Sequence, residues 1–217
     1  MKNKMNLKIT LLTLFLTITF FSCKKEKTFT DYKYSDQPVV FDCPDINNKL
    51  YDEALYSFED DILNFYGKNN PDASLILAYS NFIRNAIFGK IEYEEIVSNH
   101  SYKILEALKN EKVLWDSNSS VSRLNYKSDL MNCIASNVNQ KDLKTTLNAL
   151  LSTNSMTPKL FGRPLINKYR NVVVDKHLAS YVAFDLYYAR LYDLDLTEID
   201  FDKPEPNLDF NVILPEE

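Results

Sequence analysis

The chain has very little glycine, and this shortage excludes two familiar kinds of ligand site. Only three of its 217 residues are glycine, Gly67, Gly89 and Gly162, and they lie far apart. Phosphate-binding loops and dinucleotide-binding turns need glycines close together, because the backbone must approach the ligand there. Neither kind of loop is therefore expected. So few glycines also disfavour an all-β fold, which needs many tight turns.

Histidine is scarcer still, and no metal-binding motif is present. The two histidines, His100 and His177, are distant from each other in the sequence. Structural and catalytic zinc sites usually contain locally spaced ligands, as in the HExxH and CxxC motifs, which do not occur here. The acids of residues 193–202 alternate, but the glycine and glutamate of a calcium-binding loop are missing. We therefore expect no metal and no cofactor.

The charge balance argues against nucleic acid as a partner. Acidic residues outnumber basic ones by 30 to 25, which gives a formal net charge of −5. Residues 1–22 contain three lysines and no acid, so the chain without them carries −5 − 3 = −8. Neutralisation of phosphates by basic side chains supplies most non-specific affinity for nucleic acid. An acidic chain of this kind is poorly suited to that task.

The first residues combine a basic start with a short apolar run. Lysines at positions 2, 4 and 8 precede residues 9–21, which consist of Ile, Leu, Phe and Thr alone. A run of about 10–14 apolar residues is typical of an export signal, whereas a spanning helix needs about 20. The lysine-rich sequence KKEK at 24–27 ends the run abruptly. This pattern predicts a signal peptide over residues 1–22, which leaves 195 residues after its removal.

The stretch FFSC (residues 20–23) resembles the lipobox of bacterial lipoproteins, in which a small residue precedes a cysteine. The resemblance implies that Cys23 is acylated, with palmitate among its chains, and becomes the first residue after cleavage. Phe20 and Phe21 stand where leucine and a small residue are commoner in that family. Outer-membrane lipoproteins of the Bacteroidota tolerate such bulk, and the Asn-, Lys-, Tyr- and Ile-rich composition is similar to theirs. The alternative is an ordinary signal peptide cut nearby, with Cys23 left free.

The rest of the chain predicts an all-α fold. Residues 23–48 are polar and contain prolines, so we expect a tether that Val39–Phe41 can pin to the body. From residue 49 to 195, apolar residues recur at steps of three and four, which predicts about seven helices packed as helical hairpins. The segment 175–194 is apolar nearly all round, as in a central helix. Residues 196–217 are expected to form an extended acidic tail.

Several helix starts are expected from capping residues. Asn70 with Pro71 and Thr157 with Pro158 each suit a helix start. Residues 90–112 are expected to form one helix, and Ser119 or Ser120 could cap the helix that follows.

Some segments are harder to assign. Residues 161–164, FGRP, are expected to interrupt a helix, and residues 165–174 could form a strand. Residues 51–63 and 91–108 resemble the second helices of tetratricopeptide repeats. The 34-residue period of that family is not kept, so helical hairpins without true repeats are the favoured interpretation.

Asp185 is the most interesting candidate for a ligand-binding residue. It lies among aromatic residues that include Tyr181 and Tyr188, and a buried carboxylate needs a partner. Arg163 or Arg170 could supply that partner. One interpretation is a tyrosine-lined pocket for a small ligand or glycan. The others are a structural ion pair and a face that is simply exposed.

Two further pairs deserve mention. Asp175 lies two residues before His177, so a hydrolase-type enzyme could use this pair or Asp185, although Asp175 is more simply a helix N-cap. Cys43 and Cys133 could form a disulfide in an oxidising compartment, or they could remain two buried thiols.

These observations favour one function over two alternatives. We expect a lipid-anchored protein of the cell envelope, on the periplasmic face of the outer membrane or at the cell surface. It would bind a partner protein as an accessory subunit. The alternatives are a small-ligand or glycan-binding lipoprotein and a hydrolase.

Overall fold

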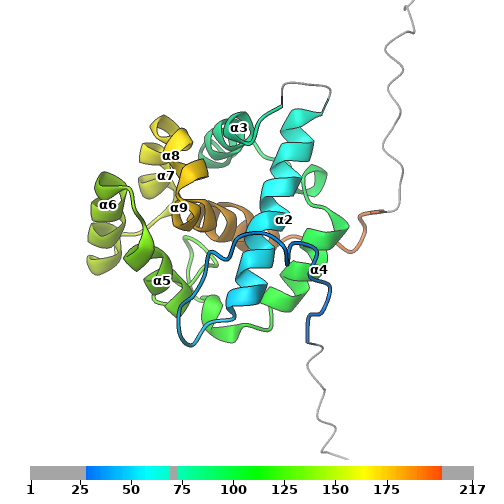
Figure 1. Ribbon diagram of the computed structural model, residues 1–217, viewed down its shortest axis with the longest axis horizontal. Coiled ribbons are helices and arrows are strands. Elements are labelled where there is room, and N and C mark those ends of the chain that lie inside the picture. The colour runs from blue at the N-terminus through cyan, green and yellow to red at the C-terminus, as the bar shows by residue number, and fades with distance from the viewer. Residues whose placement is uncertain (1–27, 69–72, 202–217) are drawn as a thin grey trace, which may run out of the picture.

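The computed structural model describes residues 28–68 and 73–201, which form an all-helical body (Figure 1). The α-helices are α2 (Asn48–Gly67), α3 (Leu75–Ile87), α4 (Asn99–Leu108), α5 (Asp129–Asn137), α6 (Lys141–Ser152), α7 (Pro158–Asn167), α8 (Tyr169–Val174), α9 (Lys176–Tyr181) and α10 (Ala189–Leu191). Two 3₁₀ turns, η1 (Tyr93–Glu95) and η2 (Lys112–Leu114), and a π-helical segment, η3 (Val182–Tyr188), complete the described elements. The expected all-α class is confirmed. Within the described ranges, no helix is both long enough and apolar enough to cross a bilayer.

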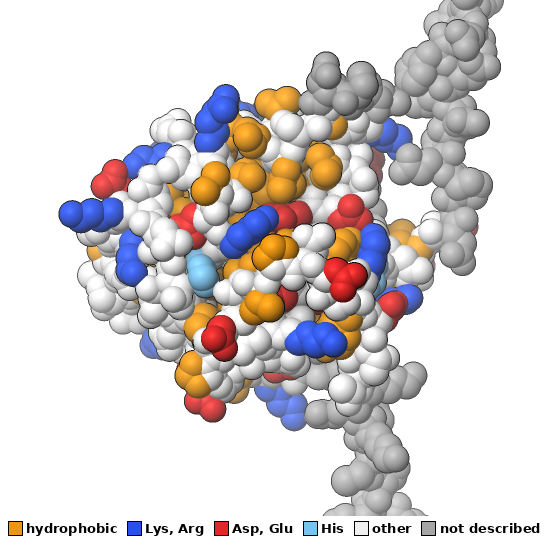
Figure 2. Space-filling view, viewed as in Figure 1, with side chains coloured by type: hydrophobic (Ala, Val, Ile, Leu, Met, Phe, Trp, Pro, Cys, Tyr) orange, Lys and Arg blue, Asp and Glu red, His pale blue; other side chains and the backbone are white. Residues whose placement is uncertain are grey.

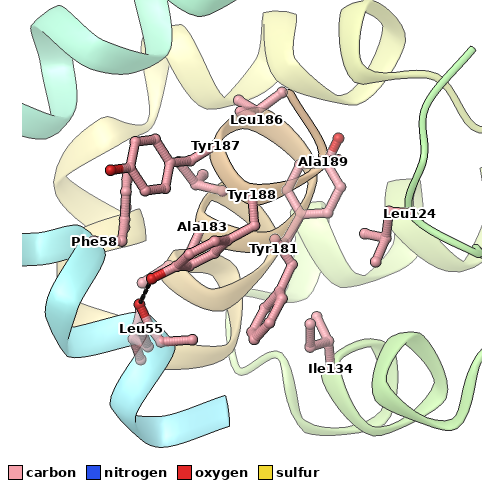
Figure 3. Packing of buried hydrophobic residues seen from close by; sticks show 14 of the residues in the cluster. Leu55, Phe58, Leu124, Ile134, Tyr181, Ala183, Leu186, Tyr187, Tyr188 and Ala189 are labelled. Carbon is pink, nitrogen blue, oxygen red and sulfur yellow. Dashed lines mark hydrogen bonds between the residues drawn. The ribbon is translucent and has the colours of Figure 1, made fainter. Parts of the chain in front are cut away.

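The core surrounds one helix, which runs without a break through α9, η3 and α10. All seven residues of η3 are buried, and Figure 3 shows why. Tyr187 and Tyr188 point toward Leu55 and Phe58 of α2, whereas the Tyr181 ring packs edge-on against Phe161 of α7. Every side of this helix therefore faces buried side chains of neighbouring segments. The expectation that 175–194 contains the central helix is confirmed.

The central helix widens into a π-helix at its most buried part. A π-helical turn bonds each N–H to the carbonyl five residues earlier, and such turns are rare. The sequence predicted a helix that is apolar nearly all round and contained no sign of the wider turn. The change of turn is a feature that only the packing decides.

Helix starts differ from the sequence-based expectations in several places. The expected cap of the second helix at residues 70 and 71 lies outside the described residues, and α3 begins after Ser74, whose hydroxyl accepts from Leu77 N–H. Residues 90–112 do not form one helix, because Ser98 caps a new start at Asn99. Ser128, rather than Ser119 or Ser120, caps α5. In each case a serine hydroxyl satisfies an N–H that the helix leaves unpaired.

The FGRP sequence does not interrupt its helix, as had been expected. Thr157 caps α7, Pro158 takes its first position, and the helix continues through Pro164 to Asn167. Phe161 and Leu165 are fully buried, and this burial holds the segment helical despite the proline. Gly162 lies so close to α3 that an added Cβ would collide with Ile87. Residues 169–174, for which a strand was one expectation, form α8.

The described part of the expected tether, residues 28–47, lies against the body. We call residues 28–47 the strap. Asp52 of α2 accepts hydrogen bonds from the N–H groups of Val40 and Phe41, at 3.2 and 3.1 Å. The Phe41 ring is buried and packs edge-on against Tyr51. Val39–Phe41 were expected to pin the segment, and the contact extends along most of the strap.

Candidate functional site

Asp185 lies at the centre of a buried cluster of hydroxyl groups. Its carboxylate accepts hydrogen bonds from Ser122 at 2.5 Å, Tyr181 at 2.6 Å and Tyr126 at 3.1 Å. Burial raises the pKa of Asp185, while the three hydrogen bonds act in the opposite direction. A carboxylate with three donors is well satisfied even without a paired cation.

The partners of Asp185 are not the ones expected from the sequence. Neither Arg163 nor Arg170 bonds to it, and Arg190 contributes only a favourable charge to it and no hydrogen bond. The Tyr188 hydroxyl donates instead to the backbone carbonyl of Ala54 at 3.1 Å. Asp185, Tyr181 and Tyr188 expose none of their surface. These residues are part of the solid core, so they do not line the tyrosine-rich ligand pocket that had been predicted around them.

A second buried carboxylate, Asp61 of α2, faces the same central helix. The Tyr187 hydroxyl donates to it at 2.5 Å, and the N–H of Ser98 donates at 3.3 Å. Burial raises the pKa of Asp61 as well. Both carboxylates thus tie the central helix to neighbouring segments. The sequence indicated the burial of Asp61 only weakly, through its position next to the apolar stripe of α2.

Among the described residues, the hydrogen bonds to Asp175 come from backbone N–H groups, and none comes from the His177 ring. Asp175 accepts from the N–H groups of His177 and Leu178, at 3.2 and 3.4 Å, as the cap of α9. Its second oxygen accepts from the N–H groups of Asn139 and Gln140, which join α5 to α6. Burial lowers the pKa of His177, which packs edge-on against Phe41. Asp175 is therefore a helix cap, as the simpler interpretation predicted, and it also holds the loop between α5 and α6.

Cys43 and Cys133 are joined by a disulfide in the structure, with Cα atoms 6.1 Å apart. Cys43 belongs to the strap and Cys133 to α5. The bond therefore connects the strap to a helix 90 residues further along the chain. It fixes the end of the strap nearest to α2.

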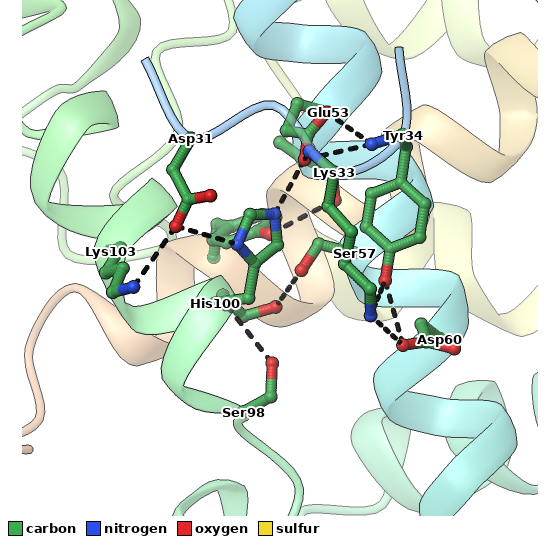
Figure 4. Close-up of polar contacts among 12 residues, drawn as sticks. Asp31, Lys33, Tyr34, Glu53, Ser57, Asp60, Ser98, His100 and Lys103 are labelled. Carbon is green, nitrogen blue, oxygen red and sulfur yellow. Dashed lines mark hydrogen bonds and ion pairs between the residues drawn. The ribbon is translucent and has the colours of Figure 1, made fainter. Parts of the chain in front are cut away.

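The other end of the strap is held by Glu53 of α2, a residue that no sequence motif singled out (Figure 4). Glu53 is almost fully buried and accepts from the N–H groups of Lys33 at 2.6 Å and Tyr34 at 3.0 Å. His100 of α4 bonds to the same carboxylate at 2.6 Å, and its second ring nitrogen lies 3.8 Å from Asp31. His100 sits in the first turn of α4 and so brings the strap, α2 and α4 together.

A surface hollow of about 400 Å³ lies between the strap, α2 and α3. Its apolar lining includes Pro38, Leu63 and Leu75. Lys176 reaches into it and bonds to Glu59 at 2.6 Å. Figure 2 shows hydrophobic side chains gathered over α3 and the adjoining end of α2, with charged side chains beside them.

Val174 is an exposed apolar residue close in sequence to Lys176. It ends α8, two residues before Lys176, and is 84% exposed. Burial of such a side chain against another protein would contribute favourably to a contact. The hollow therefore offers a mixed apolar and ionic surface for contact.

In the described part of the chain, no group of three or more His, Cys, Asp or Glu side chains is arranged to hold a metal.

Comparison with known proteins gives no relative from which a function could be transferred. No protein-family model matches the chain, and neither the curated proteins nor the solved structures include a significant match. The functional argument therefore depends on the residues themselves.

Proposed function

We propose that this chain is a lipid-anchored protein of the cell envelope, attached through Cys23, which binds a partner protein as an accessory subunit. The observation that carries the proposal is the FFSC sequence, placed between a short apolar run and a lysine-rich segment. Acyl chains contribute about 0.8 kcal/mol per buried CH₂, so two or more chains hold a protein durably on a membrane. The proposed location is the outer membrane.

The disulfide supports export from the cytoplasm. Bonds such as Cys43–Cys133 form and persist in oxidising compartments and are rare where thiols are kept reduced. An exported domain can therefore gain stability from a cross-link that a cytosolic protein would seldom keep. This support is independent of the lipobox-like sequence, because it involves different cysteines.

The hollow beside Lys176 supports partner binding. Protein interfaces combine a desolvated apolar centre with a polar rim, and exposed apolar patches mark such surfaces. Leu63 and Leu75 supply apolar lining, and the Lys176–Glu59 pair supplies charge. Val174, two residues before Lys176 in the chain, is a further exposed apolar side chain. The partner we propose is a folded envelope protein with a complementary apolar ridge.

The anchor is tested by fractionation. Cys23→Ala should release a folded protein from the membrane fraction, and labelled palmitate should enter the unaltered chain only. Intact mass of the amino-terminal peptide provides the control for cleavage. Retention of Cys23→Ala in the membrane would refute the anchor.

The partner surface is tested by cross-linking in intact cells, followed by purification and mass spectrometry. We expect a stoichiometric envelope protein with the unaltered chain. Val174→Asp should lower its recovery about tenfold, because a buried hot-spot contact contributes about 1–2 kcal/mol. Val113→Asp is the matched control, since Val113 is 62% exposed and does not line the hollow. Equal loss in both variants, or no partner at all, would contradict the proposal.

A further inference from the structure

The position of the strap determines which side of the body can face a membrane. This inference rests on the proposed acylation of Cys23. Thr28, the first described residue, is five positions after that cysteine. A chain spans at most about 3.3–3.6 Å per residue, so the Cα of Thr28 lies within about 18 Å of the anchored Cα. A folded domain with this number of residues is roughly 40 Å across. The segment between Cys23 and Thr28 is therefore too short to let the far side of the domain reach the bilayer.

The start of the strap is fixed to the outer side of α4. Asp31 bonds to Lys103 of α4 at 3.1 Å, and the Lys103 ammonium group lowers the pKa of Asp31. Phe29 packs edge-on against Tyr32, with ring centres 5.1 Å apart. In Figure 1 the described chain begins beside α4, whereas α6 and α7 lie on the other side of the molecule. The anchor point and α4 therefore share one side.

The same side carries aromatic and basic groups that suit a headgroup layer. Thr28 and Phe29 line a hollow of about 580 Å³ together with Tyr102, Lys103 and Lys109. Tyrosine rings are favoured at membrane surfaces because one end is apolar and the other polar, and lysine chains extend their charge to the phosphates. Tyr102 is additionally stacked on a second aromatic ring, that of Phe201, at 5.4 Å.

Charge alone does not drive this contact, because acids accompany the lysines. Lys109 bonds to Glu106 at 2.8 Å, and Lys103 bonds to Asp31. The short connection supplies the driving force, since it confines this side of the body near the lipid and makes the contact effectively intramolecular. From this geometry we propose that the outer side of α4, with the start of the strap, lies against the headgroup surface of the membrane. Helices α6 and α7 are then held farthest from it.

Photo-crosslinking of the full acylated chain tests this orientation. The protein is reconstituted in vesicles of phosphatidylethanolamine and phosphatidylglycerol, with p-benzoylphenylalanine at the position of Asn110 or of Lys159. Asn110 follows α4 and lines its hollow, Lys159 lies on α7, and both are exposed. We expect a several-fold excess of lipid adduct at position 110, measured by mass spectrometry.

Two controls separate the orientation from the anchor. Intact mass of the amino-terminal peptide and flotation with the vesicles report acylation at Cys23. If the chain floats but yields equal adducts, more adduct at position 159, or none at either position, the orientation is refuted while the anchor stands. If the chain is not acylated and does not float, the proposed function fails and the orientation fails with it.

Discussion

The disulfide between Cys43 and Cys133 should be the largest single contribution to stability that a conservative substitution can remove. The bond closes a loop with a sequence separation of 90 residues. In the loop-entropy model, closing such a loop stabilises the folded chain by about 4.6 kcal/mol at 25 °C, through its effect on the unfolded state. Single domains are stable by only about 5–15 kcal/mol. Cys43→Ala/Cys133→Ala should therefore leave a marginally stable protein.

The assay is urea unfolding of the chain in a Cys23→Ala background, which leaves these two cysteines alone. Fluorescence of Trp115, the only tryptophan, reports unfolding because its ring packs against Tyr192 at 5.0 Å. A urea slope of about 2–3 kcal/mol per molar converts the loss into a midpoint shift of about 2 M. The Cys23→Ala chain with its disulfide reduced is the control for lost thiol packing, and it should unfold close to the variant that also lacks Cys43 and Cys133.

The loop-entropy reasoning predicts a definite minimum effect. A loss below about 1 kcal/mol, with the bond shown by mass spectrometry to be present beforehand, would refute it. Such a result would mean that the strap and α5 are already close together in the unfolded chain.

Two further predictions concern buried carboxylates. Because burial raises the pKa of Asp185, the folded protein binds that proton more tightly than the unfolded one, and this contribution to stability falls as pH rises from about 3.9 through the raised value. Asp185→Asn should remove this fall, so unfolding in urea across pH 4 to 7 should show a flatter profile for the variant, and a steeper one would contradict the sign. Glu53→Gln should loosen the strap, because the amide accepts less strongly from Lys33, Tyr34 and His100, at a cost of about 1–3 kcal/mol. Amide hydrogen exchange should then accelerate at Lys33 and Tyr34 and not in the core of α2; unchanged exchange at both would show that Glu53 does not hold the strap.

Local pattern was sufficient to predict the helical class and the central helix. Apolar residues at steps of three and four define a helix whatever it packs against, and residues 175–194 are too apolar for any place but the core. Caps followed the same logic where one candidate stood alone, as at Asp175 and Thr157. They failed where several serines competed, because the choice of Ser128 depends on how the preceding loop is folded.

The placement of polar groups could not be predicted in the same way. Asp185 was identified as a buried carboxylate in need of a partner, but its hydroxyl donors come from Tyr181 and from a loop about 60 residues earlier. Glu53 and His100 gave no signal, since each looks like an ordinary polar residue on a helix. Their contact arises only when α2 and α4 pack together and the strap crosses both.

The sequence by itself determined the helical class, the central helix and the chemical character of residues 1–27, because each depends on a pattern within a few turns of chain. Only the tertiary structure decided that residues 28–47 are a strap, that the tyrosines around Asp185 fill the core, and that α4 adjoins the start of the described chain. These features depend on contacts between distant segments. Their energies come from burial and from pairing of groups that no local spacing brings together.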